Sequence, residues 1–178
     1  GDEIAYGPKQ FNLPNIRQRV REAMALVGLD FKGYKDRRLE TLSGGEKRKV
    51  ALASTLILDP EILLFDEPTA GMDPQARDDL LALFEELKHQ GKTIVIASHR
   101  LDELARVAES LSLMQAGIVL NTGKTCQMLN DSESLTQAGL SAPLAIQLTQ
   151  ALIKKGWPLN GMDTATPGRL ASALKELT

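Results

Sequence analysis

Two short apolar runs constrain the fold of this chain more than any other feature of its sequence. Residues 62–65 read ILLF and residues 93–97 read TIVIA, and polar side chains follow each run, Asp66-Glu67 after the first and His99 after the second. A continuous apolar run of this length is typical of a strand that is buried on both faces. We therefore expect two buried strands that present polar side chains at their ends.

The segment between the two runs has the pattern of a helix. Asp73 can cap a helix that starts at Pro74, and Gly91 can end it. Its apolar residues recur at helical spacing: Leu80, Leu81, Leu83, Phe84 and Leu87. Residues 101–108 then predict a short helix, and residues 110–115 and 118–121 predict a hairpin. Strands that alternate with helices imply right-handed crossovers and a mostly parallel sheet, so the predicted fold class is α/β.

The residues before this region are predicted to be mainly helical. Apolar residues recur at helical spacing between Ile16 and Val27, and Ser43 can cap a helix that ends before Asp59. Residues 1–14 contain Gly7, Pro8 and Pro14, which indicate a short strand or loop, and the polar residues 30–41 indicate a loop.

The C-terminal part has a different pattern. Residues 143–155 and 167–177 predict two helices, joined by a loop that contains proline, glycine and Trp157. We expect a small helical appendage that begins at about residue 132.

Composition excludes several classes of function. A net charge of -2, from 21 basic and 23 acidic residues, gives no electrostatic basis for nucleic-acid binding, and only 4% of residues are aromatic. The single cysteine, Cys126, excludes an internal disulfide. No apolar run approaches the roughly 20 residues of a membrane-spanning helix, so any membrane association is expected to be peripheral.

The start of the helix after Ser43 suits an anion. The first N–H groups of a helix lack internal partners, and the helix dipole adds partial positive charge there. Gly44 and Gly45 let an anion approach the backbone closely, so Ser43-Gly44-Gly45 is a candidate phosphate site. The alternative is an ordinary glycine-rich turn capped by serine.

The acidic pair after the first apolar run suits metal and water chemistry. Two carboxylates where a strand leaves the core are expensive to desolvate unless they are used. Asp66 can hold Mg²⁺, and Glu67 can orient or deprotonate a water molecule. The alternative is a solvated strand end.

His99 can reach a developing phosphate charge or have a structural role, whereas His89 suits the end of a helix.

Together these features resemble the second half of an ATP-binding-cassette (ABC) nucleotide-binding domain, which is a P-loop NTPase of RecA-like fold. The resemblance covers roughly residues 1–123, and its motifs occur in the order and spacing of that family. Glu46 stands where Gln is commoner in the signature motif. The matches are the signature motif LSGGE at 42–46, Walker B at 62–66, the catalytic-glutamate position at Glu67, the D-loop at 70–73 and the switch histidine at His99.

The resemblance implies ATP and Mg²⁺ as ligands. In the family, one ATP is held between the P-loop of one subunit and the signature motif of its partner, so it also implies a head-to-tail dimer of ATPase subunits. It assigns nucleotide contacts to Ser43, Gly44, Gly45 and Glu46, a Mg²⁺ ligand to Asp66, water activation to Glu67, a γ-phosphate contact to His99 and a link across the dimer to Asp73.

The resemblance also predicts the domain organisation. Residues 1–131 form a truncated ABC ATPase domain, and residues 132–178 form the helical appendage. Within the first, a helical signature subdomain occupies about 12–60, and the Walker B, D-loop and switch core occupies about 61–123.

Other motifs of the family have no match in these residues. No GxxxxGK[ST] pattern occurs, so the phosphate-cradling loop and its lysine are missing. We therefore expect the isolated chain to be inactive as an ATPase. By the resemblance, the strand before that loop lies between strands 93–97 and 110–115, so we expect a complementing or swapped chain, or a rearranged sheet, to fill the gap.

The sequence DEIAYGP at residues 2–8 and the helical C-terminal tail resemble ATPase subunits of energy-coupling-factor and cobalt-type importers. Those proteins take up vitamins or metal ions with a separate transmembrane subunit, which implies a peripheral location on the cytoplasmic side of the membrane. Two alternatives remain: an ABC ATPase that is not a transporter, and a non-catalytic half of a split cassette.

Overall fold

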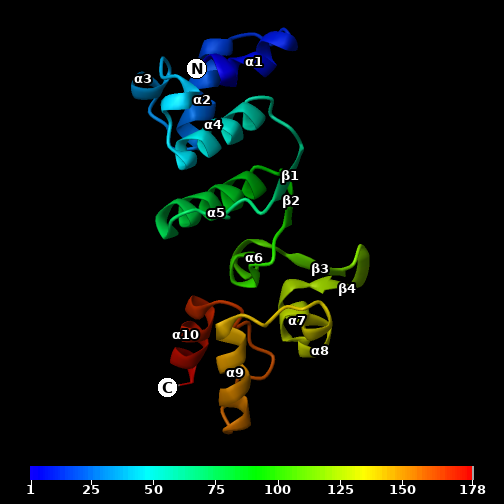
Figure 1. Cartoon of the computed structure of the whole chain (residues 1–178). Coiled ribbons are helices and arrows are strands. Elements are labelled where there is room, and N and C mark those ends of the chain that lie inside the picture. The colour runs from blue at the N-terminus through cyan, green and yellow to red at the C-terminus, as the bar shows by residue number, and fades with distance from the viewer. Residues whose placement is uncertain (178) are drawn as a thin grey trace. The chain divides into compact units, whose positions relative to one another are not determined.

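Two groups of elements pack separately in the computed structural model, which describes residues 1–177 (Figure 1). The first group runs from Gly1 to Ile96, and the second begins at Ala97. Residue 178, the last of the predicted appendage, lies outside the described residues. The predicted boundary near residue 131 stays a prediction. We describe each unit by itself.

The first part of the N-terminal unit is helical. Helices α1, α2 and α4 pack against one another, and their contact buries apolar side chains such as Ile4, Met24 and Ala53. Helices α2 and α4 were both predicted. The elements of this part are α1 (Asp2–Gln10), α2 (Ile16–Leu26), α3 (Phe31–Tyr34), the 3₁₀ helix η1 (Leu39–Thr41) and α4 (Gly44–Leu56).

Two sequence expectations for this part are wrong. Residues 2–10 form a helix rather than a strand or loop, although Pro8 lies inside it. Ile4, Ala5 and Pro8 are all buried, so packing against α2 and α4 outweighs the local preference of proline. The polar segment 30–41 contains α3 and η1, and the Asp30 side chain caps α3 by accepting a hydrogen bond from Gly33 N.

A strand–helix–strand unit follows. Strand β1 (Ile62–Asp66) pairs with β2 (Thr93–Ala97), and α5 (Pro74–His89) connects them. Thr93 N donates to Glu61 O at 2.8 Å, so the two strands start side by side, as parallel strands do. Asp73 caps α5, and all five predicted stripe residues of α5 are buried. This part of the α/β fold was predicted correctly.

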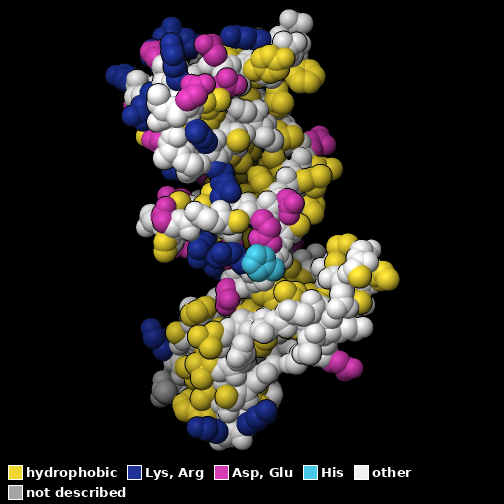
Figure 2. Space-filling view, viewed as in Figure 1, with side chains coloured by type: hydrophobic (Ala, Val, Ile, Leu, Met, Phe, Trp, Pro, Cys, Tyr) yellow, Lys and Arg dark blue, Asp and Glu magenta, His cyan; other side chains and the backbone are white. Residues whose placement is uncertain are grey.

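One face of this small sheet is covered by α5, and the other is exposed. The Phe65 and Phe84 rings lie 4.7 Å apart, which places α5 on the face that Phe65 shares with the buried Leu63. On the opposite face, Ile62, Leu64 and Val95 are 61%, 74% and 52% exposed. Figure 2 shows apolar side chains gathered on the surface in this region. The expectation that β1 and β2 are buried on both faces is therefore wrong for this chain.

The C-terminal unit contains a hairpin and short helices. Strands β3 and β4 pair antiparallel with Gln115 opposite Ile118, and the turn residues Ala116 and Gly117 have φ of 49° and 79°, as a type I′ turn requires. The hairpin and α6 were predicted. The elements are α6 (Leu101–Val107), β3 (Ser110–Gln115), β4 (Ile118–Lys124), α7 (Thr125–Asn130), α8 (Ser132–Gln137), α9 (Leu144–Lys154) and α10 (Pro167–Glu176).

The end of the C-terminal unit has its own small core. Helices α9 and α10 are both predicted helices, and Ala145, Leu159, Leu170 and Ala173 form a buried apolar cluster there. Strands β2 and β3 belong to different sheets among the described residues. Every helix within residues 1–177 is too short or too polar to span a bilayer.

Candidate functional site

The start of α4 is closed by a capping box. Ser43 has an extended backbone, and its Oγ accepts a hydrogen bond from Glu46 N at 3.2 Å. In return, Ser43 N donates to Glu46 Oε2 at 2.7 Å. The predicted N-cap is therefore confirmed, and two backbone donors at this helix end are satisfied by side chains.

Gly44 and Gly45 leave the tip of α4 open. A Cβ atom added at either glycine would meet no other atom within 4 Å. Both glycines lie in the first turn, where backbone N–H groups have no acceptor within the helix. An anion can therefore approach these two N–H groups without displacing a side chain, and the helix dipole favours its charge.

The Glu46 carboxylate is held by three donors. Besides the Ser43 amide, the Tyr34 hydroxyl donates to Oε1 at 2.6 Å and Arg37 Nη1 donates to the same oxygen at 3.3 Å. The hydrogen bond from Tyr34, followed by that from Ser43, holds the pKa of Glu46 at about 2, below its ordinary value of 4.5. The same contact raises the pKa of Tyr34. The carboxylate is thus kept ionised and directed toward its own helix start and α3.

Sequence reasoning missed Tyr34 and Arg37. Both lie in the segment 30–41, which was expected to be a polar loop. Neither residue belongs to a recognisable motif, and Tyr34 is 12 residues from its partner Glu46. No sequence signal connects them, since the contact depends on how α3 packs beside α4.

The end of β1 presents the predicted acidic pair on a strained turn. Asp66 is exposed at the last position of the strand. Glu67 follows with φ of 43°, in the left-handed region that residues other than Gly, Asn and Asp rarely adopt. Thr69, in the same turn, is buried at 1% exposure. Such strain is often found at functional sites, where the surrounding structure maintains it.

The loop between β1 and α5 is attached to α4. Arg48, on α4, donates a hydrogen bond to the carbonyl of Ala70. At the start of α5, Arg77 Nη2 donates to Met72 O at 3.3 Å, and Asp73 Oδ1 accepts from Ala76 N at 3.0 Å. The sequence indicated only that Lys47, Arg48 and Lys49 fan around the helix, and it did not distinguish Arg48 from its neighbours.

The predicted histidine belongs to the C-terminal unit. His99 is exposed and lies two residues after the last residue of β2. The next residue, Arg100, donates its backbone N–H to Ser98 Oγ at 3.1 Å, and its guanidinium pairs with Glu103 at 3.4 Å. His89 lies in the last turn of α5, as predicted. Ser43, Asp66, Glu67 and Asp73 therefore belong to the N-terminal unit, whereas His99 belongs to the C-terminal unit.

Asp66 and Glu67 fit a Mg²⁺ site only if other ligands, such as phosphate oxygens and water, complete it. Across the described chain, no three His, Cys, Asp or Glu side chains gather into a group that could hold a metal ion alone. Mg²⁺ needs no such group, because it is commonly bound by one or two carboxylates together with phosphates and water. The exposed Asp66 carboxylate is compatible with that role.

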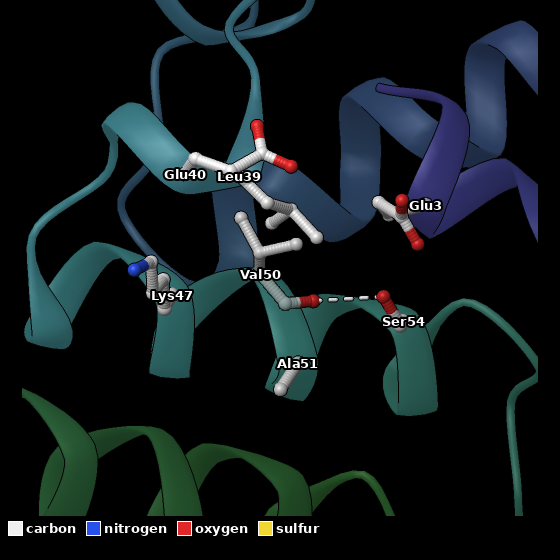
Figure 3. Close-up of a pocket in the computed structure, with 7 residues that line it drawn as sticks. All are labelled: Glu3, Leu39, Glu40, Lys47, Val50, Ala51 and Ser54. Carbon is white, nitrogen blue, oxygen red and sulfur yellow. Dashed lines mark hydrogen bonds between the residues drawn. The ribbon is translucent and has the colours of Figure 1, made fainter.

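A hollow lies on another side of α4. It has a volume of about 470 Å³ and contains none of the predicted site residues. In Figure 3, Leu39 and Val50 point toward each other across it, and Ser54 Oγ donates to Val50 O at 2.9 Å. The lining residues are Glu3, Leu39, Glu40, Lys47, Val50, Ala51 and Ser54.

Comparison with known proteins gives a family model and close relatives. Residues 4–105 match the model described as "AAA domain, putative AbiEii toxin, Type IV TA system". The chain is 38% identical over 161 residues to the energy-coupling factor transporter ATP-binding protein EcfA2 of Clostridium tetani, an alignment that covers 89% of this chain and 56% of that protein. It is 44% identical over 142 residues to the nickel import ATP-binding protein NikO of Rhodobacter capsulatus, which covers 78% of this chain and 56% of that protein.

A solved structure agrees with these relatives. The structure of cbiO1 from Clostridium perfringens, described as part of the ABC transporter complex cbiONQ, matches with a TM-score of 0.64 and 31% identity. The match covers 83% of this chain and 59% of that chain. The chain therefore spans little more than half the length of the relatives it matches.

Proposed function

Because the chain belongs to the AAA-domain family and its relatives are ATP-binding subunits of ABC transporters, we propose that it is part of the ATP-hydrolysing subunit of an ABC importer. The importer is of the energy-coupling-factor or cobalt type, and ATP hydrolysis drives uptake of a vitamin or a metal ion. The subunit works at the cytoplasmic face of the membrane as a peripheral partner of a transmembrane subunit.

The observation that carries this proposal is the geometry at the start of α4. Ser43 closes a capping box with Glu46, while Gly44 and Gly45 stay open to the surroundings. This arrangement leaves backbone N–H groups at the positive end of a helix available for a phosphate. Ser43 and Gly45 contact the γ-phosphate of an ATP held by the opposing subunit, in a head-to-tail dimer of ATPase subunits.

The remaining site residues take the roles that their positions allow. Asp66 would hold Mg²⁺, which would neutralise phosphate charge. Glu67 orients and deprotonates the attacking water, and His99 donates a hydrogen bond to the γ-phosphate. Asp73, at the cap of α5, links the two nucleotide sites across the dimer. Support for Glu67 comes from its strained backbone, with φ of 43°.

The isolated 178-residue chain does not turn over ATP in this proposal. It contains no GxxxxGK[ST] sequence, so it provides no loop and no lysine to cradle the triphosphate. Steady-state phosphate release from the purified chain should therefore be at background. A robust rate that Glu67→Gln abolishes would contradict this part of the proposal.

We also propose that a complementing or swapped chain takes the place of the missing P-loop strand, and that it covers the exposed side of the small sheet. Ile62, Leu64 and Val95 together form a contiguous apolar strand surface, which is unusual on a protein that has no partner there. A dimer or a complex with a complementing chain buries this surface. A monodisperse monomer with an ordinary cooperative unfolding transition would argue against it.

The test of the whole proposal is made on the complete ATPase subunit with its transmembrane partner. Glu67→Gln should abolish ATP hydrolysis while nucleotide binding is retained, and uptake of the solute should stop with it. The matched control is Glu61→Gln, which replaces the exposed glutamate just before the same strand. Full hydrolysis in Glu67→Gln would exclude the assigned role of this residue.

A further inference from the structure

Three side chains meet beside the start of α4. The Tyr34 hydroxyl, at the end of α3, donates to Glu46 Oε1 at 2.6 Å, and Arg37 Nη1 donates to the same oxygen at 3.3 Å. The Arg37 guanidinium also lies 4.9 Å from the centroid of the Tyr34 ring. Each of the three therefore contacts the other two, and the cluster joins α3 to α4.

The other oxygen of Glu46 connects this cluster to the helix start. Oε2 accepts from Ser43 N at 2.7 Å, and Glu46 N donates to Ser43 Oγ at 3.2 Å. With both carboxylate oxygens engaged, the Glu46 side chain is restricted to one orientation. The position of the Ser43 backbone therefore depends on the atoms that hold Glu46 from outside the helix.

Tyr34 is presented by a supported segment. Asp30 Oδ2 accepts from Gly33 N at 2.6 Å and caps α3. The Arg21 guanidinium of α2 lies 5.2 Å from the centroid of the Phe31 ring. These contacts anchor α3 at its first turn, so the Tyr34 hydroxyl approaches Glu46 from a defined direction.

A carboxylate at this position creates an electrostatic problem. Glu46 lies in the first turn of a helix whose tip receives a phosphate, and two anions near one helix start repel each other. The Tyr34 hydroxyl and the Arg37 guanidinium both donate to Oε1, and the Arg37 cation offsets part of the carboxylate charge. A neutral glutamine at the same position would need neither the Tyr34 hydroxyl nor the Arg37 cation.

We propose that Tyr34 is a positioning residue for α4, which holds Glu46 in its capping-box orientation and thereby fixes the Ser43-Gly44-Gly45 turn in its ATP-binding conformation. This inference rests on the proposed function of that turn. Tyr34 does not contact ATP itself and acts only through Glu46.

The test measures ATP hydrolysis by the complete ATPase dimer. Tyr34→Phe removes only the hydroxyl, so the KM for ATP should rise roughly three- to tenfold, the effect of losing one hydrogen bond, while kcat changes less than about twofold. In the Glu46→Gln background the same substitution should change KM less than about twofold, because no charge remains to be held. The matched control is Tyr6→Phe, since Tyr6 is 65% exposed on α1, and it should leave both constants unchanged.

A second measurement on the 178-residue chain separates positioning from general destabilisation. Carbon-13 NMR of the Glu46 carboxyl should show its pKa rising in Tyr34→Phe but not in Tyr6→Phe. An unchanged Glu46 titration would overturn the inference, and so would an equal KM effect in the Glu46 and Glu46→Gln backgrounds.

A further variant distinguishes failure of this inference from failure of the proposed function. Gly45→Asp places a negative side chain at the open tip of α4 and should abolish hydrolysis. If Gly45→Asp is inactive but Tyr34→Phe keeps the wild-type KM, the positioning role is wrong and the signature site stands. If Gly45→Asp hydrolyses ATP normally, the proposed function of the turn fails, and the inference fails with it.

Discussion

The Arg48 guanidinium on α4 donates a hydrogen bond to the backbone carbonyl of Ala70, in the loop that follows β1. The two residues are 22 positions apart in the sequence, so this contact links elements that no local signal connects. It joins the helix that begins at Ser43 to the loop that leads to Asp73. Within the N-terminal unit, a displacement of either element therefore affects the other.

Removing this contact should weaken the N-terminal unit. Arg48→Ala is expected to lower the free energy of unfolding by about 0.5 to 1.5 kcal/mol, the range of a single net hydrogen bond, and to lie near the lower limit because the site is exposed. Urea denaturation followed by circular dichroism measures the change. Lys47→Ala, which removes the neighbouring cation, is the control, and an equal loss in both variants would mean that the Ala70 contact contributes nothing.

Adjacent leucines of β1 should respond very differently to truncation. Leu63 is 2% exposed and Leu64 is 74% exposed. Leu63→Ala should cost about 2 to 5 kcal/mol of unfolding free energy, because it leaves a cavity beneath the sheet. In the monomer, where nothing covers this face, Leu64→Ala should change it by less than about 0.5 kcal/mol. Urea denaturation at low protein concentration makes the comparison, and a large loss at Leu64 would show that this face is covered in solution.

The elements that the sequence predicted correctly carry their own local signals. Helix α5 has a capping Asp73, a proline in its first turn and an apolar stripe, and all of these appear in the structure. The Ser43 cap and the hairpin turn at Ala116-Gly117 are equally local. In each case the residues that determine the conformation lie within a few positions of it.

The features that were missed depend on residues distant in sequence. Helix α1 forms despite Pro8, because its buried face packs on α2 and α4. The Tyr34–Glu46 contact arises only when α3 lies beside α4. The exposure of Leu64 could not be predicted either, since an apolar run indicates that a strand is suited to burial and does not specify what covers it.

Stability should depend on pH through Glu46. Its pKa is about 2 in the folded chain, below the ordinary 4.5, because Tyr34 and Ser43 donate hydrogen bonds to the ionised carboxylate. A group whose pKa is lower in the folded state stabilises the fold fully above its unfolded pKa, and this contribution is lost as the pH falls through the folded pKa. The contribution of Glu46 should therefore decline from about pH 4.5 toward about pH 2.

Urea denaturation of wild type and Glu46→Gln across this range measures the effect. Glutamine does not titrate, so the unfolding free energy of Glu46→Gln should fall less steeply as the solution becomes more acidic. Tyr34→Phe should show an intermediate slope, because it retains the bond from Ser43. Parallel curves for the three proteins would contradict the assignment.

The strain at Glu67 gives the last prediction, which concerns the balance between stability and function. Glu67 has φ of 43°, a left-handed conformation that asparagine tolerates better than a long side chain does. Glu67→Asn and Glu67→Gln both remove the charge and carry an amide, so their difference in unfolding free energy includes the backbone strain. The asparagine variant should be more stable by about 0.5 kcal/mol or more. Equal stabilities in urea denaturation would contradict strain in this loop. The expected difference would mean that a glutamate at this position lowers stability, which is typical of a residue that is retained for chemistry.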